Sequence, residues 1–270
     1  MSVTVDEFGH VLHEWQEENS APWGKLRYHS TWRNIAKHIE DRPLRILDIG
    51  GGDGMDAIHY ASLGHSVTLS DCSSTMLSEA KKSADEQGVT ERLRFIQTGP
   101  EAVPDLFHEK PFDLILCHMM IEFVPDAQSL LRNACNLLST NGLFSVLDTN
   151  RYSDVYMQAF QKKSLSGACN VVGKREYFHP WVNRLTPRFS ADEIIDQFSQ
   201  NSCSLVGYYG VLSVCAYLPN EPKFDPEYYS ELEILEDSLT DRYPYYLLAR
   251  FFQVIVQKTD DIPVTLATSG

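Results

Sequence analysis

A glycine-rich segment constrains the fold of this chain more than any other feature. Residues 46–57 read ILDIGGGDGMDA, with four glycines in five positions between an apolar run and a helical pattern. Because glycine lacks a Cβ atom, such a loop can adopt positive φ angles and let a ligand approach the backbone. The N–H groups that begin the next helix would face the same place. A dinucleotide, a nucleoside without phosphates and a simple tight turn are the alternatives.

Strand-like apolar runs alternate with helical patterns between residues 44 and 150. We expect strands at 44–49, 66–70, 93–97, 112–118 and 143–148, and helices at 55–63, 74–87 and 127–138. Ser73 or Ser74 is the candidate N-cap of the second helix, which Gly88 ends. Strands that alternate with helices pair in parallel through right-handed crossovers. The pattern predicts a doubly wound α/β fold with a mostly parallel sheet.

The flanking segments predict additions to this core. Residues 5–40 have a mostly helical pattern, 151–189 resemble an insertion over the sheet, and 190–198 predict a capped helix. Two further strands, at 205–217 and 251–257, bring the sheet to seven strands, with a tyrosine-rich helical stretch at 226–250 between them. We therefore expect one domain over 1–270, with an N-terminal helical cap (1–43), a binding core (44–150) and two cap segments (151–189 and 218–250).

The charge of the chain limits its classes of partner. Lys and Arg number 23 against 37 Asp and Glu, which gives a net charge of −14. Loose nucleic-acid binding depends on basic side chains, so this charge disfavours tRNA, although it allows a local basic patch. The N-terminus does not read as a secretory leader, and no run of about 18 apolar residues occurs. We expect a cytoplasmic protein without a membrane partner; the sequence does not indicate its oligomeric state.

The cysteines and histidines lack the spacing of metal ligands. The six cysteines form no CxxC pair, and the nine histidines form no HxxxH or HExxH pattern. We therefore predict reduced, structural thiols and no metal site.

Two frames of the glycine loop imply different ligands. Residues 52–57 satisfy the dinucleotide pattern GxGxxA, but they begin three residues beyond the strand that this pattern normally follows directly. The other frame, residues 48–54, reads DxGxGxG from the end of the strand. Its carboxylates, Asp48 and Asp53, would lie where a pyrophosphate otherwise sits. Negative side chains suit a cationic ligand better than an anionic one.

The second frame resembles the first motif of the class I S-adenosylmethionine-dependent methyltransferases. Asp71 ends the second strand, where an acid can accept hydrogen bonds from ribose hydroxyls, as it can in NAD proteins. Residues 99–101 follow the third strand, where the family contacts adenine. Residues 112–124 and 138–143 resemble its fourth strand and its Leu-x-Pro-Gly-Gly turn. The resemblance implies a Rossmann-like methyltransferase fold, enzymatic activity and S-adenosyl-L-methionine as the cofactor.

Segments outside this half are similar to a narrower group, the CmoM-type methyltransferases, which methylate the carboxylate of carboxymethoxyuridine at the wobble position of tRNA. The similar segments are 24–27, 47–54, 64–65, 118–122, 185–187, 232–236, 243–245 and Arg250. The resemblance implies cofactor contacts at Arg27, Gly50, Gly51, Asp71, the region of Pro100, and His118. From the motif and its surroundings we add Asp48, Gly52, Cys72, Met76 and Glu101.

Three of these candidates have alternative, structural interpretations. Arg27 could pair bidentately with the methionine carboxylate of the cofactor, or form a surface ion pair. His118, at the end of a strand, could face the methyl-transfer channel or serve as a hydrogen-bonded structural residue. Met76 could cover the adenine or belong to the core.

The acceptor determines whether a general base is needed. A carboxylate acceptor is ionised at neutral pH and needs none, whereas a hydroxyl or amine would need one, for which His118, Glu122 and His179 are candidates. We take His118 and Glu122 as candidate catalytic residues. Candidate acceptor contacts are Tyr177, His179, Arg184, Tyr245, Tyr246 and Arg250, with Arg250 expected to hold an anionic group. The aromatic residues could equally pack the caps onto the core.

Four functions follow in order of preference. The first is S-adenosylmethionine-dependent O-methylation of a small or medium-sized acceptor that bears a carboxylate. The second is methylation of the tRNA wobble carboxymethoxyuridine itself. The third is non-methyl chemistry on the sulfonium, such as intramolecular cyclisation, and the fourth is a non-catalytic cofactor-binding subunit.

Overall fold

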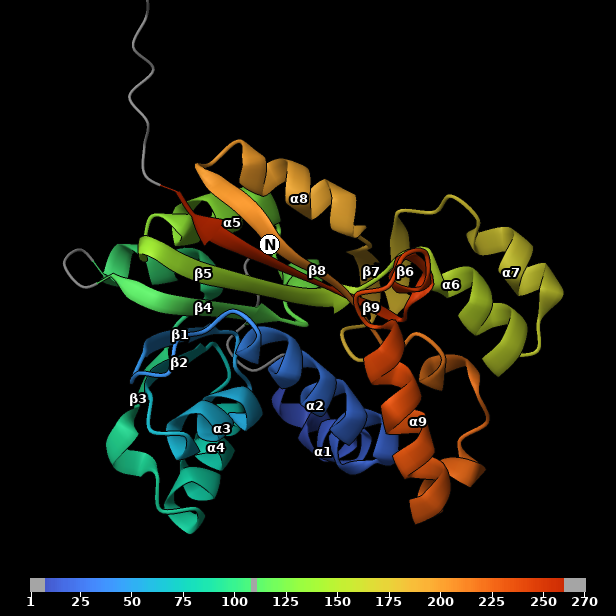
Figure 1. Ribbon diagram of the computed structural model, residues 1–270, viewed down its shortest axis with the longest axis horizontal. Helices are drawn as coiled ribbons and strands as arrows, with labels where there is room; N and C mark the ends of the chain where they lie inside the picture. The colour runs from blue at the N-terminus through green and yellow to red at the C-terminus, as the bar shows by residue number, and fades with distance from the viewer. Residues whose placement is uncertain (1–7, 108–110, 260–270) are drawn as a thin grey trace, which may run out of the picture.

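The computed structural model describes residues 8–107 and 111–259 (Figure 1). Residues 5–7 of the predicted N-terminal helical segment lie outside the described residues, as do 260–270. No helix of the described chain is long and apolar enough to cross a membrane.

A seven-stranded sheet forms the centre of the molecule, in the order β3-β2-β1-β4-β5-β9-β8. The first five strands pair in parallel, and β9 runs antiparallel between β5 and β8. The predicted doubly wound, mostly parallel sheet is therefore confirmed. Its strand order reverses at β1 and β4, which is where open α/β sheets bind ligands. The strands are β1 (Arg45–Ile49), β2 (Ser66–Asp71), β3 (Leu93–Gln97), β4 (Phe112–His118), β5 (Leu138–Thr149), β8 (Cys203–Val211) and β9 (Phe251–Lys258).

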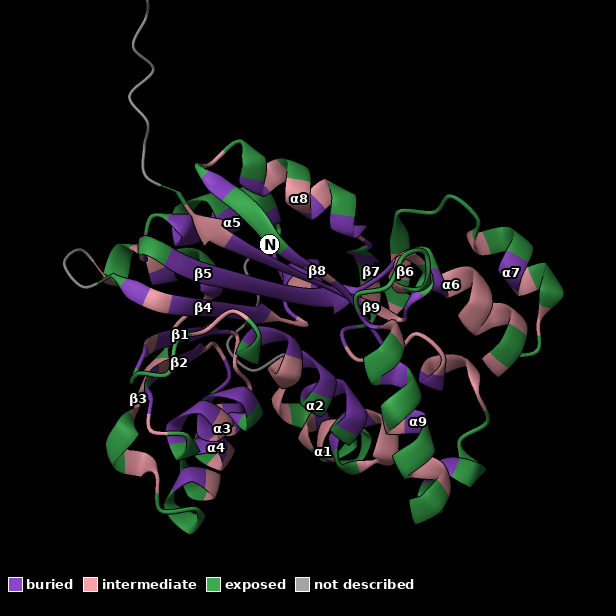
Figure 2. Cartoon of the chain, in the orientation of Figure 1, coloured by how far each residue is buried: buried purple, intermediate pink, exposed green. Residues whose placement is uncertain are grey.

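Helices cover both faces of the sheet (Figure 1). On one face lie α2 (Pro22–Ala36), α3 (Met55–Ser62) and α4 (Ser74–Glu86), and on the other α5 (Ala127–Cys135) and α8 (Ala191–Ser199). Local capping fixes where two of these helices begin. Ser73 accepts the N–H of Met76, and Ser190 forms a reciprocal capping box with Glu193. The strands between the layers are buried along most of their length (Figure 2).

Some predicted boundaries were wrong, among them the end of the helix predicted over 127–138, which lies at Cys135. The fifth strand begins at Leu138 rather than at 143, because Leu138 already pairs with Phe112 ahead of an irregularity in the ladder. The strand predicted to reach 217 ends at Val211. Leu212 has a φ of +58°, which breaks the extended conformation, and the next three N–H groups bind the carboxylate of Glu236 instead of a strand.

The remaining segments gather at the end of the sheet toward which β5 points (Figure 1). The α-helix of the tyrosine-rich stretch ends at Leu239; a turn with the cis bond Tyr243–Pro244 and a short 3-10 helix, Tyr245–Leu248, follow it. The hairpin β6–β7 forms a small separate sheet. The elements are α1 (Leu12–Ser20), α6 (Ser153–Tyr156), α7 (Leu165–Val171), β6 (Glu176–His179), β7 (Arg184–Pro187) and α9 (Pro226–Leu239).

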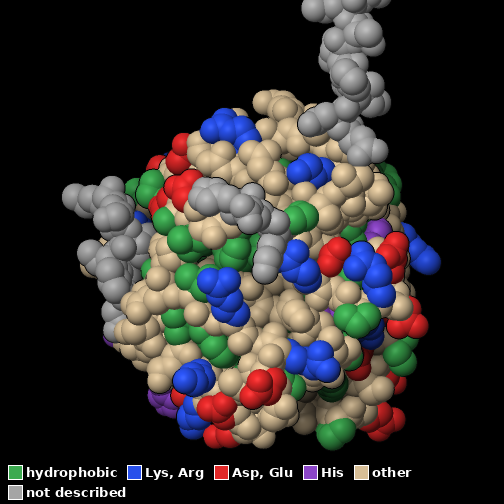
Figure 3. Space-filling model, turned by 90° about the vertical axis from the view of Figure 1, so that its left-hand side faces the viewer, with side chains coloured by type: hydrophobic (Ala, Val, Ile, Leu, Met, Phe, Trp, Pro, Cys, Tyr) green, Lys and Arg blue, Asp and Glu red, His purple; other side chains and the backbone are tan. Residues whose placement is uncertain are grey.

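Charge is mixed on the face at the left-hand side of Figure 1. Figure 3 shows Lys and Arg side chains there interspersed with Asp, Glu and hydrophobic ones. The described residues of this face therefore form no continuous basic surface of the kind that grips nucleic acid.

Candidate active site

The glycine loop begins directly at the end of β1 and depends on glycine at two positions. A Cβ atom on Gly50, whose φ is +71°, would lie 2.4 Å from Cγ of Met120. One on Gly51 would lie 2.5 Å from Oδ2 of Asp48. Both backbone N–H groups donate to the carbonyl of Ser70, which holds the loop against β2. A side chain at either position would fill the space that the loop leaves open.

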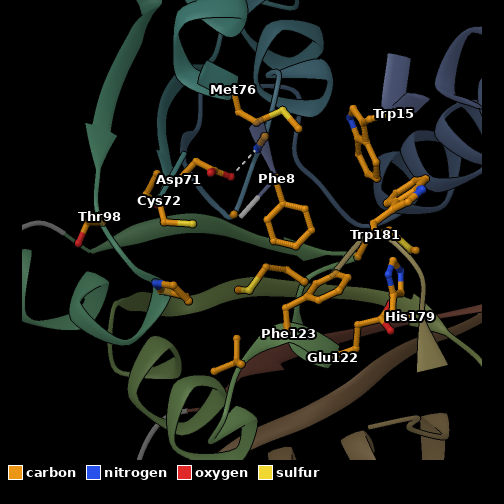
Figure 4. Close-up of a pocket in the computed structure, with 17 residues that line it drawn as sticks. Phe8, Trp15, Asp71, Cys72, Met76, Thr98, Glu122, Phe123, His179 and Trp181 are labelled. Carbon is orange, nitrogen blue, oxygen red and sulfur yellow. Dashed lines mark hydrogen bonds between the residues drawn. The ribbon is translucent and has the colours of Figure 1, made fainter. Parts of the chain in front are cut away.

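Asp71 ends β2 beside this loop. Its carboxylate accepts the N–H of Gly52 at 3.0 Å and that of Ser73 at 2.8 Å, so its orientation is fixed (Figure 4). Burial raises its pKa, and these hydrogen bonds act in the opposite direction. The arrangement leaves acceptor capacity for a ligand hydroxyl, because each carboxylate oxygen can accept a second bond.

A cavity of about 100 Å³, the glycine-loop cavity, lies against these residues. It brings together six residues predicted to bind the cofactor: Gly50, Gly52, Asp71, Cys72, Met76 and Pro100. They come from the end of β2, the segments that follow β1, β2 and β3, and the first turn of α4, all near where the parallel strands end. This combination of an open backbone, a fixed acid and apolar side chains suits a nucleoside.

Aromatic rings from distant segments form the opposite side of this cavity (Figure 4). We call this side the aromatic wall; it consists of Phe8, Trp15, Phe123, His179 and Trp181. Its rings meet in sequence, with centroid distances of 4.9 Å between Phe8 and Phe123, 5.1 Å to His179, 5.5 Å to Trp181 and 5.8 Å to Trp15. Edge-to-face contacts at these distances stabilise the wall beyond the area it buries.

His118 lies in a smaller hollow of about 50 Å³ beside the loop, with both ring nitrogens engaged. Nδ1 lies 2.8 Å from Oδ2 of Asp56, and Nε2 lies 2.9 Å from Oγ of Ser145. Burial acts to raise the pKa of Asp56, but the charge and hydrogen bond of His118 outweigh it and the pKa is lowered. His118 is therefore held by the protein, and neither nitrogen is free to take a proton from an acceptor.

Asp48 also faces this hollow. It is buried, and its Oδ2 has no hydrogen-bond partner within the described chain. Burial, together with the charges of Asp56, Asp71 and Asp53, raises its pKa well above the usual value. Burial thus disfavours the charged form of Asp48, which opposes the charge argument made from the motif.

Arg27 projects from α2 between the hollow and a larger cavity. Only 7% of it is exposed, so it is not the surface ion pair that was the alternative. Its guanidinium lies 4.4 Å from the ring centroid of Tyr28 and donates to Oδ1 of Asn19 at 2.7 Å. These neutral partners leave its charge available to an anion.

The larger cavity, which we call the charged cavity, has a volume of about 460 Å³. It shares Trp15, Glu122, His179 and Trp181 with the glycine-loop cavity, so the two adjoin. Tyr177 also lines it. Four cations face it, namely Arg27, Arg188, Lys223 and Arg250.

Glu122 is occupied by protein partners. It is 2% exposed, accepts the hydroxyl of Thr186 at 3.0 Å and forms an ion pair with Arg188. Burial raises its pKa, while the charge of Arg188 opposes the rise. Its carboxylate therefore orders this wall of the cavity.

His179 lines both cavities, and its Nδ1 is buried without a hydrogen-bond partner in the described structure. Burial lowers its pKa to about 4, and the charges of Arg188, Arg184 and Arg250 act in the same direction. It is thus a neutral imidazole at pH 7 and a weak base.

Four predicted residues do not line these cavities. Glu101 is exposed, and Arg184 donates to the carbonyl of Phe123 at 3.5 Å. Tyr245 is 52% exposed, and the ring of Tyr246 packs 4.5 Å from that of Tyr208 on β8. The chain turns after Leu239 and carries both tyrosines along the sheet, away from the charged cavity.

Other cavity residues went unnoticed in the sequence. Arg188 directly follows residues 185–187, which were singled out in the sequence, so its position next to that segment could have identified it. Trp15 and Trp23 lie in a helical pattern without a motif, and Lys223 lies in a turn that reads as solvent-exposed. Only the fold shows that these side chains point inward.

Comparisons with known proteins identify the family of the chain. Residues 40–191 match the family model of a methyltransferase domain. The chain is 28% identical over 245 residues to the tRNA 5-carboxymethoxyuridine methyltransferase of Escherichia coli (strain K12), covering 87% of this chain and 89% of that protein. It is 31% identical over 144 residues to the ubiquinone/menaquinone biosynthesis C-methyltransferase of Rickettsia peacockii, covering 51% and 57%.

The fold also has solved relatives. The crystal structure of Burkholderia thailandensis 1,6-didemethyltoxoflavin-N1-methyltransferase, with bound 1,6-didemethyltoxoflavin and S-adenosylhomocysteine, aligns with a TM-score of 0.60 at 20% identity, covering 94% of this chain and 86% of that one. The matching domain spans more than half of the chain, and the strand order, glycine loop and acid after β2 agree with it. The chain therefore belongs to the class I S-adenosylmethionine-dependent methyltransferases.

Proposed function

We propose that the protein transfers the methyl group of S-adenosylmethionine to a carboxylate oxygen of an anionic acceptor bound in the charged cavity. The cationic lining of that cavity carries the proposal. Arg27, Arg188, Lys223 and Arg250 all face it, although the chain as a whole has a net charge of −14. Glu18 and Glu122 also line it, so the cations exceed the carboxylates by two, and a cavity with an excess of one charge concentrates ligands of the opposite sign.

The state of the candidate bases supports the same acceptor. Both nitrogens of His118 are engaged, Glu122 is paired with Arg188, and the pKa of His179 is about 4. A hydroxyl or amine would have to lose a proton to one of them, whereas a carboxylate is already ionised at neutral pH. The residues around the cavity therefore need only to orient the acceptor and exclude water.

The residues around the glycine loop fit the cofactor. Asp71 would accept the ribose hydroxyls, Met76 and Pro100 would contact the adenine, and Arg27 would pair with the methionine carboxylate. When bound, S-adenosylmethionine supplies a methyl group already activated by its sulfonium. His179 and Trp181, which line both cavities, would lie beside the transfer path.

The wobble carboxymethoxyuridine of tRNA is a second candidate acceptor. The similarity to the E. coli tRNA enzyme over 87% of this chain favours it. The exposed lysines Lys162 and Lys163, next to α7, could contact phosphates near the cavity. The net negative charge of the chain opposes it.

An acceptor screen with isotope-labelled methyl donor tests the proposal. The protein is incubated with a panel of carboxylic, hydroxyl and amine compounds and, separately, with bulk tRNA. We expect the label in a product that releases methanol under mild alkali, as methyl esters do. Label confined to alkali-stable products would refute carboxyl methylation, and labelled tRNA would establish the second candidate. Methylthioadenosine formed without an acceptor would indicate intramolecular chemistry instead.

A further inference from the structure

Lys223 is a buried cation in the wall of the charged cavity, on a short turn before α9. It is 2% exposed. Its ammonium donates to the carbonyl of Leu218 at 3.0 Å and to Oδ1 of Asn220 at 2.8 Å, and lies 5.6 Å from the ring centroid of Trp23. All these partners are neutral, and a third N–H remains for another acceptor.

The acids near Lys223 do not neutralise it. No carboxylate of the described residues lies within 4.0 Å of its nitrogen. The carboxylate of Glu236, which acts on Lys223 through space, accepts the N–H groups of Ser213, Val214 and Cys215, and Glu221 in the same turn is exposed. Glu18, which also lines the charged cavity, is exposed and accepts the Nε1–H of Trp23 at 2.7 Å. Burial lowers the pKa of Lys223, against the smaller effects of Cys215, Glu236 and Glu221. A buried charge without a counterion is costly unless a ligand supplies one.

The other cations of the cavity differ in this respect. Arg188 pairs with Glu122 and Asp154, and Arg250 pairs with Asp154. Arg27 donates to the neutral Asn19 and acts through space on Asp53 and Asp56, and the proposed function assigns it to the methionine carboxylate of the cofactor. Lys223 is thus the cavity cation that neither the protein nor the cofactor pairs with a carboxylate. An anionic group of the acceptor would supply that partner. Lys223 does not line the glycine-loop cavity, so this partner lies away from the methyl donor.

We infer that the acceptor carries a second anionic group, a carboxylate or a phosphate, which Lys223 binds while the first carboxylate is methylated. The inference rests on the proposed function and deepens it. A cavity of about 460 Å³ has room for such a dianion, and the side chains of Trp15, Tyr177 and Trp181 line it, which suits an apolar or aromatic body between the two charges. Lys223 would then select dianionic over monoanionic acceptors.

Binding of matched probes tests the inference. Calorimetry on the protein saturated with S-adenosylhomocysteine compares benzene-1,3-dicarboxylate, its monomethyl ester and 3-phosphonobenzoate. We expect a dianion to bind about ten-fold more tightly than the ester, since one charge-assisted contact is added. The stronger of the two dianions identifies the second group as carboxylate or phosphate.

Variants assign that preference to one residue. Lys223→Met, which fills the same space without charge, is expected to reduce the preference to within about two-fold and leave the affinity for the ester unchanged. Lys223→Arg keeps the positive charge and should retain part of the preference for dianions. It is the control for a folding defect caused by replacing Lys223. Lys174→Met, at an exposed lysine outside both cavities, should behave as the parent protein.

Two results would overturn the inference: dianions that bind no more tightly than the ester, or a preference that survives in Lys223→Met. Alkali-labile methyl esters formed equally on mono- and dicarboxylic acids would refute only the role of Lys223. Alkali-stable products would refute the proposed function, whichever probe binds.

Discussion

The two adjoining cavities are built in different ways. The glycine-loop cavity takes its binding groups from three loops that follow successive strands, and much of its surface is backbone and apolar side chain. The charged cavity takes its four cations from α2, the segment after β7, the turn before α9 and the residue before β9. Recognition on the first side depends on main-chain geometry, and on the second side on charges brought together by tertiary structure. A fold can thus keep its cofactor while its acceptor changes.

The largest effect of a substitution at either cavity is expected at the ion pair between Arg188 and Glu122, which lies on the charged side. Arg188→Met leaves a buried carboxylate without its partner, which should reduce the free energy of unfolding by about 3–5 kcal/mol. Urea denaturation at pH 7 measures the change. The double variant Glu122→Gln with Arg188→Met removes both charges and should recover most of the loss. No recovery would mean that Arg188 stabilises the fold through packing.

On the cofactor side, Asp71→Ala should weaken S-adenosylmethionine binding by about 100-fold. The change removes the predicted ribose contact and leaves the N–H groups of Gly52 and Ser73 without their acceptor. Calorimetry measures the affinity. Glu101→Ala, at the exposed acid after β3, is the control and should bind as the parent protein does. An equal loss in both variants would contradict the assignment to Asp71.

On the acceptor side, Arg250→Gln should raise KM for the acceptor about ten-fold with little change in kcat. The variant removes a charge from the cavity, while Asp154 keeps Arg188 as a partner. Steady-state kinetics with varied acceptor measure it, and Arg242→Gln on the exposed turn is the control. A change in the KM for S-adenosylmethionine instead would place Arg250 on the cofactor side.

A smaller effect is expected from pH. Because the pKa of His179 is lowered to about 4, the imidazole is neutral above that value, and a carboxylate acceptor is ionised above about pH 5. The kcat/KM should therefore change less than about two-fold between pH 6 and 8 and fall below pH 5. If kcat/KM instead rose with pH through an apparent pKa of 6–8, a base would be removing a proton from the acceptor, as a hydroxyl acceptor requires.

The smallest effect is expected at the tyrosines of the C-terminal stretch. Tyr245→Phe and Tyr246→Phe should leave kcat and KM within about two-fold, because neither side chain lines a cavity. Tyr177→Phe, at a tyrosine that lines the charged cavity, is the comparison in the same assay. Equal losses in all three would mean that the C-terminal tyrosines reach the acceptor.

The difference between the two cavities also explains how much of the fold and the site could be predicted from the sequence. The strands, the glycine loop and Asp71 follow from local patterns, since the carboxyl ends of parallel strands meet at one edge. The acceptor side depends on where the chain turns. The positive φ of Leu212 and the turn after Leu239 carry Lys223 inward and Tyr245 outward, and no periodicity in the sequence indicates either. The place of the C-terminal tyrosines between the last two strands suggested that they contact the acceptor, but Tyr245 and Tyr246 line neither cavity, whereas Arg250 of the same stretch lines the charged one.

The positions of the tryptophans have a practical consequence. The chain has four: Trp15 and Trp181 line both cavities, Trp23 lines the charged cavity, and Trp32 donates to Asp56 beside His118. Each indole thus lies at or next to the proposed binding groups. The intrinsic fluorescence of the protein should therefore report ligand occupancy directly, without an attached dye. Trp23 lines the charged cavity and not the glycine-loop cavity, so its contribution to the signal belongs to the acceptor side.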